Sequence, residues 1–181
     1  MRARTLGAAL LALPFVAAGA LPGLSVQPGS RVWVDGSSNT SFWHCVSDAP
    51  RGSADAGTTD PARIAVVRRA EIVVPVATLE CGNQTMNEHL LRALRADAAP
   101  EIRFRPRSVR LVRADGGWTA TLSGRLSVGG RARRVTVHAD VAGENGGLRV
   151  RGRKTLRMTD WGVAPPTLMM RSVVVDPGVT V

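Results

Sequence analysis

The second half of the chain alternates between apolar and polar residues over long stretches. Between Trp118 and Val128 every second residue is apolar or glycine, and the residues between them are Thr, Ser or Arg. Val135 to Val141 repeats the pattern. A period of two is typical of a strand with one buried and one exposed face. We therefore predict long β-strands here, joined by the short turn at Gly129-Gly130.

Shorter apolar runs predict further strands, and turn residues between them favour antiparallel neighbours. Residues 48–61 are rich in Gly, Ser, Asp and Pro and are predicted to form a loop. Gly124 and Gly152 lie inside long strands, which predicts a bent sheet that closes on itself. The fold class is therefore all-β: an antiparallel barrel of about eight strands. The further strands are predicted at residues 30–35, 40–47, 70–79, 102–104, 109–111, 148–153 and 173–181.

One segment favours a helix instead. Thr85 stands three residues before Glu88, which is the spacing of a capping box. Met86, Leu90 and Leu94 follow at i, i+4 and i+8 and predict one apolar face. We expect this helix, ended by the proline at position 100, as one of one or two short helices at one end of the barrel.

The N-terminus has the features of a secretory signal. Arg2 and Arg4 precede an apolar run that ends in Ala18-Gly19-Ala20, the small-residue pattern of a cleavage site. The run is too short for a membrane anchor. We predict a signal peptide over 1–20, a lead-in over 21–29 and one domain over 30–181. The mature protein would then be periplasmic or secreted.

Export also bears on the two cysteines. In an oxidising compartment, Cys45 and Cys81 are expected to form a disulfide. The alternatives are a metal-binding pair or a catalytic thiol, but two isolated cysteines lack the four-ligand pattern of zinc sites.

Most of the net charge of +10 comes from arginine, because Lys154 is the only lysine. Removal of residues 1–20 would lower it to +8. The chain is 4% aromatic and has no Tyr, which disfavours nucleic acid as a partner. The arginines of the later strands form either a solvated outer face or a docking surface for an anionic membrane or envelope component. They are Arg125, Arg133, Arg134, Arg149, Arg151 and Arg153.

The sequence contains no recognisable catalytic or metal-binding motif. His44, His89 and His138 have no compact metal-ligand spacing, no serine lies in a G-x-S-x-G elbow, and no glycines form a phosphate loop. We predict no cofactor, no metal and no enzymatic activity. Three hypotheses stay open: a lipid carrier, an interaction protein with a filled barrel, and an enzyme that uses His89 or Asp160.

Several segments in order resemble the YceI family of polyisoprenoid-binding proteins of the bacterial envelope. They are residues 73–83, 86–90, 100–104, 122–130, 134–137 and 158–166, with Trp161 where Phe is common. The resemblance implies a lipocalin-like barrel that holds a long polyisoprenoid, isoprenoid quinone or fatty amide, with no catalytic residues. It also implies that Cys45 and Cys81 correspond to the cysteines of a disulfide-bearing exported subset.

The alternation and the resemblance together predict which residues line the cavity. The partner is a long-chain isoprenoid or another lipid, and a homodimer is a further expectation. The candidate lining residues are Phe42, Ile72, Val74, Leu90, Leu94, Phe104, Leu111, Trp118, Leu122, Leu126, Val137, Leu156, Met158 and Trp161.

The predicted export can be tested by the mass of the mature protein. We expect the exported chain to start at Leu21, because cleavage follows Ala20. Ala18→Arg should block cleavage, since the site requires small residues. Intact mass spectrometry of both proteins checks this, and an exported wild-type chain that still starts at Met1 would contradict it.

Overall fold

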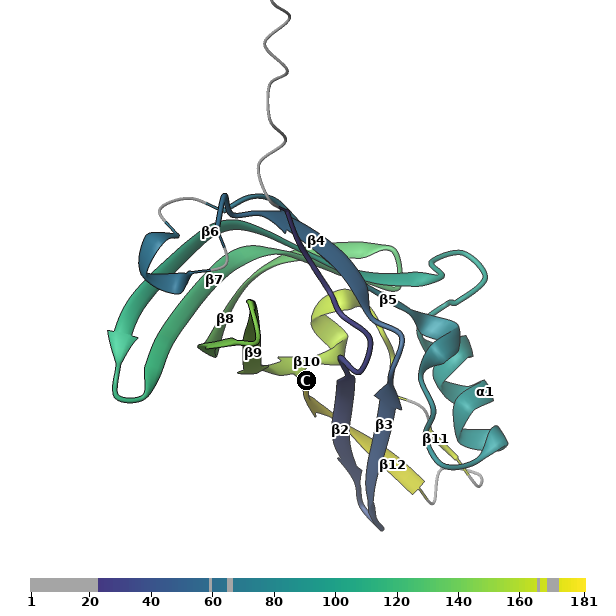
Figure 1. Cartoon of the computed structure of the whole chain (residues 1–181). Coiled ribbons are helices and arrows are strands. Elements are labelled where there is room, and N and C mark those ends of the chain that lie inside the picture. The colour runs from purple at the N-terminus through teal and green to yellow at the C-terminus, as the bar shows by residue number, and fades with distance from the viewer. Residues whose placement is uncertain (1–22, 59, 65–66, 166, 169–172) are drawn as a thin grey trace, which may run out of the picture.

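The computed structural model describes residues 23–58, 60–64, 67–165, 167–168 and 173–181. The predicted signal peptide, residues 1–20, lies outside them. The described chain forms two antiparallel sheets, one of which is long and strongly curled (Figure 1). In spatial order the curled sheet contains β1 (Gly23–Ser25), β4 (Arg51–Asp55), β5 (Arg68–Pro75), β6 (Glu101–Ala114), β7 (Gly117–Val128), β8 (Arg131–Glu144) and β9 (Gly147–Arg153). The second contains β10 (Thr155–Arg157), β12 (Val173–Thr180), β2 (Val32–Ser38) and β3 (Phe42–Ser47), and β11 (Thr167–Leu168) pairs with β12.

The predicted all-β, antiparallel, barrel-like fold with a helix at one end is confirmed, but the count of eight strands is wrong. The described residues contain twelve strands. The segment predicted as a loop over 48–61 contains β4, and β1 lies within the predicted lead-in. Both strands are short and lack apolar alternation. They form because β4 pairs with β5 and β1 pairs with β4.

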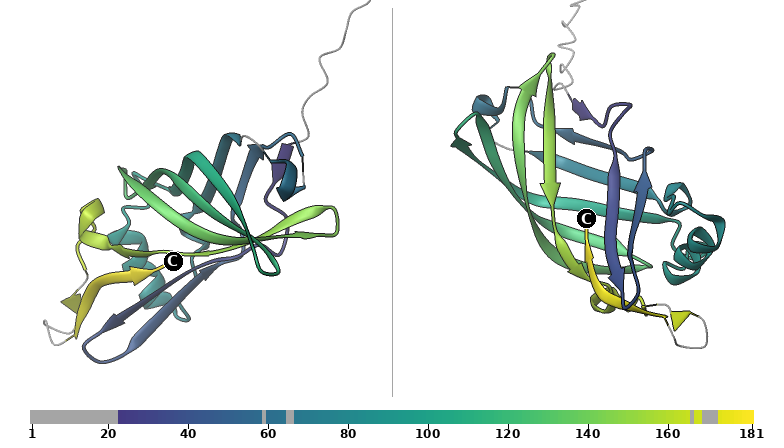
Figure 2. Two further views of the ribbon diagram at one scale, coloured as in Figure 1. Left: turned by 90° about the vertical axis from the view of Figure 1, so that its left-hand side faces the viewer. Right: turned by 90° about the horizontal axis from the view of Figure 1, so that it is seen from below.

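The two sheets are joined at corners where the chain passes from one to the other. β9 continues into β10 through Lys154, whose backbone N–H and C=O pair with Val181 at 2.7 and 2.9 Å. At the other side β3 leads into β4, and Val46 pairs with Glu80 at 2.9 and 2.8 Å. The second sheet therefore lies across the concave side of the curled sheet (Figure 2).

The curled sheet bends at a bulge in β6. The pairing of β6 with β7 shifts between Pro106 and Ser108, opposite Gly124. A Cβ atom on Gly124 would lie 2.3 Å from the carbonyl oxygen of Arg105, so only glycine allows this close approach. The bend is therefore located at one of the predicted glycines. It joins the two predicted strands at 102–104 and 109–111 into one strand of 14 residues.

Helix α1 (Gln84–Ala93) begins at Asn83, and the predicted Thr85–Glu88 capping box is wrong. Asn83 has extended backbone angles, and its side-chain oxygen accepts a hydrogen bond from the Met86 N–H at 2.9 Å. Thr85 is already inside the helix, so its side chain cannot act as the cap. Arg95 has a positive φ of 56° and ends the helix before Pro100. No helix within the described ranges is long and apolar enough to span a membrane.

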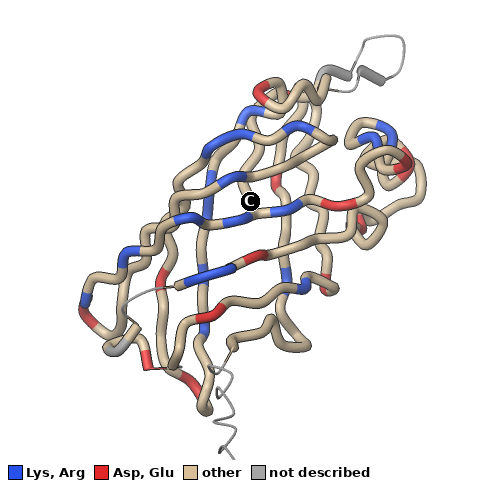
Figure 3. Tube along the Cα trace, turned by 90° about the horizontal axis from the view of Figure 1, so that it is seen from above, with Lys and Arg blue, Asp and Glu red and all other residues tan. Residues whose placement is uncertain are grey.

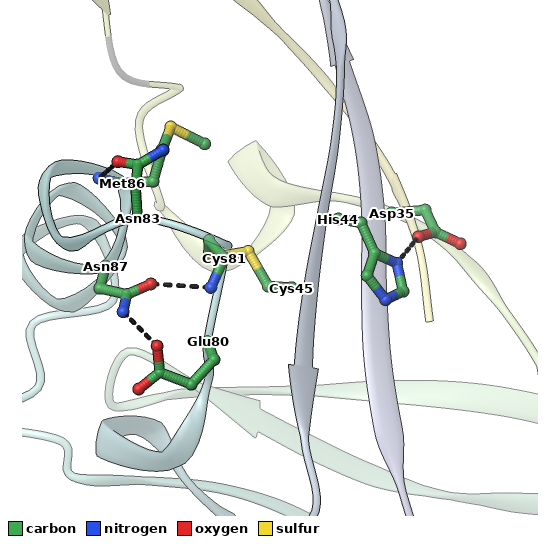
Figure 4. Close-up of a disulfide and its surroundings, with 8 residues drawn as sticks. All are labelled: Asp35, His44, Cys45, Glu80, Cys81, Asn83, Met86 and Asn87. Atoms are coloured by element: carbon green, nitrogen blue, oxygen red, sulfur yellow. Dashed lines mark hydrogen bonds and ion pairs between the residues drawn. A yellow bond between two sulfur atoms is a disulfide. The ribbon is translucent and has the colours of Figure 1, made fainter.

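The predicted Cys45–Cys81 disulfide is present and ties β3 to the segment that leads into α1 (Figure 4). Asn87 of α1 supports the same junction. Its side-chain oxygen accepts a hydrogen bond from the Cys81 N–H at 2.7 Å, and its amide group donates to Glu80 at 2.5 Å. The disulfide therefore links the second sheet to the helix end of the molecule.

Loss of this disulfide should destabilise the fold. The bridge spans 36 positions, and the entropy of closing such a loop in the unfolded chain is worth about 4 kcal/mol. We expect Cys45→Ala/Cys81→Ala to lower the free energy of unfolding by up to about this amount in denaturant titrations. Reductant should lower the stability of the wild type but not that of the variant. Equal stability of the oxidised wild type and the variant would contradict the prediction.

Candidate ligand-binding interior

Apolar side chains on the concave side of the curled sheet form two separate clusters. The first lies at the α1 end and has six buried members: Val76, Leu79, Leu94, Val135, Trp161 and Val163. The second lies farther along β7 and β8 around Ala120, Ala139 and Val141. The second follows from the alternation of β7 and β8, which directs every second side chain to the concave side. In the first, only Val135 comes from a long strand, and the other five members come from segments packed against it.

Trp161 closes the α1 end of the interior. It belongs to η3 (Met158–Trp161) and is only 5% exposed. Its indole N–H donates a hydrogen bond to the carbonyl of Leu126 on β7 at 2.9 Å. Arg133 of β8 donates to the carbonyl of Asp160 at 2.9 Å. These bonds fix η3 against the curled sheet, so the cluster around Trp161 is a packed core.

Other apolar side chains on the concave side remain accessible. Ile72 pairs in register with Phe104 and lies on the concave face, yet it is 38% exposed. Val150 pairs with the buried Val141 and is 55% exposed. Leu122 and Val137 face each other on β7 and β8 and are half-buried. Apolar groups at the centre of a packed fold would be buried, so this face is an open apolar surface.

A pocket of about 60 Å³ lies between α1, the disulfide and η3. Trp43, both disulfide cysteines, Met158 and Val163 line it together with residues of α1. Gly36 of β2 makes room for Trp43, because a Cβ atom on Gly36 would lie 2.0 Å from the Trp43 ring. An apolar cavity that holds a benzene molecule measures about 150 Å³. The pocket is therefore large enough for only one end of a longer apolar molecule.

The structure brings most of the predicted lining residues together, in two groups. The first cluster contains eight of them: Leu90, Leu94, Phe104, Leu126, Val137, Leu156, Met158 and Trp161. The second contains Leu111, Trp118 and Leu122. Val74 is buried outside these clusters, and Phe42 lies apart from them, 92% exposed at the start of β3. Whether any of these residues contacts a ligand stays a prediction.

Several residues of the pocket are not among the predicted lining residues. Met86, His89 and Ala93 line it from α1, next to the predicted Leu90 and Leu94. Their spacing of i, i+3, i+4, i+7 and i+8 is that of one helix face, so the pattern could have identified them. Trp43, Val163 and Val175 come from segments without such a pattern.

The convex side of the curled sheet carries arginines in direct opposition. Arg105, Arg125 and Arg134 are partners in one row across β6, β7 and β8. A second row contains Arg110, Thr121, His138 and Arg153. The hydroxyls of Ser123 and Thr136 lie between the rows, 3.0 Å apart. We call the nine residues named here the basic face; Figure 3 shows Lys and Arg along these neighbouring strands.

Only one arginine of the basic face has a carboxylate partner within the described chain. Glu71 binds Arg105 at 2.8 Å and Arg103 at 3.1 Å. Desolvation alone would raise the pKa of Glu71, but the hydrogen bonds and charges of Arg105 and Arg103 outweigh it and lower that pKa. Arg110, Arg125, Arg134 and Arg153 are exposed and form no ion pair with a described residue. Like charges directly opposite each other destabilise a sheet. The row of Arg105, Arg125 and Arg134 therefore favours the binding of a negatively charged partner.

The described residues contain no group of three His, Cys, Asp or Glu side chains that could hold a metal ion. His44 and Asp35 lie 2.5 Å apart on β3 and β2, but both are largely exposed and no third ligand accompanies them (Figure 4). His138 forms a hydrogen bond with the Thr121 hydroxyl at 3.3 Å. The chemistry available in the interior is therefore mainly apolar contact.

Comparisons with known proteins agree with this geometry. The family model described as YceI-like domain matches residues 33–181. BcnA from Burkholderia cenocepacia has a similar structure, with a TM-score of 0.65 and 19% identity over 82% of this chain and 91% of that one. A polyisoprenoid-binding domain from Saccharophagus degradans, implicated in plant cell wall breakdown, gives a TM-score of 0.60 and 12% identity, covering 89% and 94% of the two chains. The YceI protein from Campylobacter jejuni gives 0.51 and 15%, covering 100% and 96%. No curated protein sequence matches the chain significantly.

Proposed function

Because the chain belongs to the YceI-like family, we propose that it is a binding protein that holds a long apolar ligand against the concave side of its curled sheet. The ligand is a polyisoprenoid, an isoprenoid quinone or a fatty amide, carried or stored outside the cytoplasm after export. One observation carries the proposal: Ile72, Leu122 and Val137 face the interior but are not buried there. One of the similar structures is a polyisoprenoid-binding domain, which supports the ligand class.

The energetics favour such a ligand. Burial of one CH₂ group contributes about 0.8 kcal/mol, so one five-carbon isoprene unit contributes roughly 4 kcal/mol before the entropy of binding is subtracted. A few units laid on the exposed apolar side chains would suffice for stable binding without specific polar contacts. The two apolar clusters supply the contact surface that such a ligand needs. Binding is therefore the activity that fits this surface best.

A bulky residue on the concave side should block the ligand. Leu122 is half-buried on β7, so Leu122→Trp would fill ligand space and leave the melting temperature within a few degrees of the wild type. Thr119→Trp places the same bulk on the convex side of the same strand and is the control. We expect organic extraction and mass spectrometry to recover lipid from the wild type and the control but not from Leu122→Trp.

A large drop in the melting temperature of Leu122→Trp would instead show that side chains fill the interior. Overpacking of a core costs about 1–3 kcal/mol, so Leu122→Trp would then melt early. If the wild type, purified from its own host, also yields no lipid, the proposal of a lipid carrier is refuted.

A second activity is suggested by the basic face. Four exposed arginines without ion pairs lie on neighbouring strands next to hydroxyl groups that can donate hydrogen bonds to phosphate oxygens. We propose that this face docks on an anionic phospholipid bilayer, which would supply the missing negative charge. Few aromatic residues are present for base stacking, so a nucleic acid is the less favoured partner.

Removal of two opposed arginines should weaken membrane binding. Each arginine near an anionic surface contributes about 1 kcal/mol, so Arg125→Gln/Arg134→Gln should lower binding to phosphatidylglycerol vesicles roughly thirtyfold. Arg31→Gln/Arg92→Gln removes the same charge outside the curled sheet and is the control. Vesicle sedimentation at low and high salt measures the effect, since salt screens such contacts. Equal losses in both variants, or binding to an oligonucleotide but not to vesicles, would contradict the proposal.

A further inference from the structure

Arg113 places a positive charge on the concave side of the curled sheet, at the end remote from α1. It lies near the end of β6, directly opposite Trp118 of β7, and Trp118 in turn lies opposite Val141 of β8. Residues directly opposite each other share one face of a sheet, so Arg113 lies on the same face as these apolar residues. Its guanidinium carbon is 5.8 Å from the centroid of the Trp118 ring. This is a cation–π contact, which holds the guanidinium over the ring.

The register of β6, β7 and β8 places two other arginines on this face, and both already have partners. Arg133 lies opposite Leu126, and its guanidinium donates to the carbonyl of Asp160. Arg131 packs on the backbone of Gly162, where a Cβ atom would lie 2.4 Å from the arginine Nη1 atom. Both arginines therefore serve to hold η3 and its C-terminal end at the α1 end of the sheet.

Arg113, by contrast, is exposed and has only Trp118 as a partner. Its guanidinium forms no ion pair with any carboxylate of the described chain, including that of Asp115 in the adjoining turn. It is therefore a positioned cation whose hydrogen-bonding groups are free to bind an anion.

An accessible apolar surface begins beside this charge. The row of Arg113 and Trp118 continues through Val141 to Val150 of β9, and Val150 is 55% exposed. Four larger side chains of the second cluster are each only half-buried: Leu111, Trp118, Leu122 and Leu148. One cation therefore borders an apolar surface that the described side chains cover only in part.

This combination suits an amphiphile with a single negative charge. A guanidinium matches the two oxygens of a carboxylate with two parallel hydrogen bonds. A phosphate monoester carries more than one negative charge at neutral pH, whereas the register of the described strands β6 to β9 brings no second arginine to this end of the concave face. Quinone and amide groups are uncharged and would leave the charge of Arg113 unbalanced. The carboxylate of a fatty acid is therefore the group that fits these surroundings best.

We propose that Arg113, held against Trp118, binds the carboxylate of a fatty acid whose acyl chain lies on the second apolar cluster and extends towards α1. The cation–π contact fixes the guanidinium before the ligand arrives, so less side-chain entropy is lost on binding. Because Arg113 is exposed, the carboxylate keeps water on its outer side and avoids most of the desolvation cost of a buried ion pair. The inference rests on the proposed lipid-binding function and specifies the polar end of the ligand.

The test compares a fatty acid with its amide. Laurate and lauramide have the same acyl chain and nearly the same size, but only laurate is charged at neutral pH. Their affinities for the delipidated full-length mature protein are measured by displacement of the neutral fluorescent probe Nile red. We expect laurate to bind roughly threefold to tenfold more tightly than lauramide, as for a charged hydrogen bond at a partly exposed site. Added salt should reduce this preference, because it screens exposed charges.

Two variants assign the preference to Arg113. Arg113→Gln should remove it while the affinity for lauramide is unchanged, and Arg113→Lys, which keeps the charge but lacks the planar fork, should retain part of it. Arg151→Gln is the control, because Arg151 lies opposite Asp140 on the convex side and its loss removes the same charge. This control should leave the preference unchanged. Thermal melting of each variant confirms that it is folded.

The outcomes separate this inference from the proposed function. If the wild type binds both compounds equally, or if folded Arg113→Gln still prefers laurate, the assignment of Arg113 is overturned while lipid binding stands. Equal losses of affinity for laurate and lauramide in Arg113→Gln would show that Arg113 only shields Trp118, which also overturns it. If the wild type binds neither compound, the lipid-binding function falls and this inference falls with it.

Discussion

The interior of this protein depends on a mismatch in length between the curled sheet and the helix that covers it. Strands β6, β7 and β8 have 14, 12 and 14 residues, whereas α1 has ten and lies at one end. Alternation gives each long strand a continuous apolar face. The helix and η3 bury that face near Trp161 and Leu94, but Leu122 packs in the second cluster, away from them, and is only half-buried. Because exposed apolar surface is unfavourable in water, the fold is best completed by an apolar molecule.

The closed end is held by contacts that the open part lacks. The Cys45–Cys81 disulfide, the hydrogen bonds of Asn87 and the bond from Trp161 to β7 join the helix, η3 and both sheets. The pocket lies at this junction, so its walls belong to the most cross-linked part of the molecule. A binding site gains from walls that are already fixed, because less entropy is lost when the ligand binds.

The sequence predicts the fold well where side chains alone determine the structure. The strand predicted from Trp118 to Val128 corresponds to β7, Gly117–Val128. It is recognisable because the apolar residues of one face alternate with the polar residues of the other along the sequence. β4 has no such alternation, because it is held by backbone pairing with β1 and β5, which are distant in the sequence. Asn83 and Thr85 are both good capping residues, and the choice depends on the turn at Gly82, whose φ is +88°. The alternation and the resemblance predict Phe42 as a lining residue, but it lies at the exposed start of β3, where the β2–β3 hairpin projects from the barrel (Figure 1).

One backbone register specifies both surfaces of the curled sheet. Leu122 and Ser123 are neighbours on β7, yet Leu122 faces Val137 in the interior and Ser123 bonds Thr136 on the basic face. A shift of one residue would bring Arg125 inside and expose Leu122, because side chains alternate along a strand. The turn at Gly129 and Gly130, with φ of 55° and 81°, sets this register by pairing Val128 with Arg131. Through this register, the glycines at these two positions determine which side chains face the apolar interior and which form the arginine row. The turn itself lies outside both surfaces.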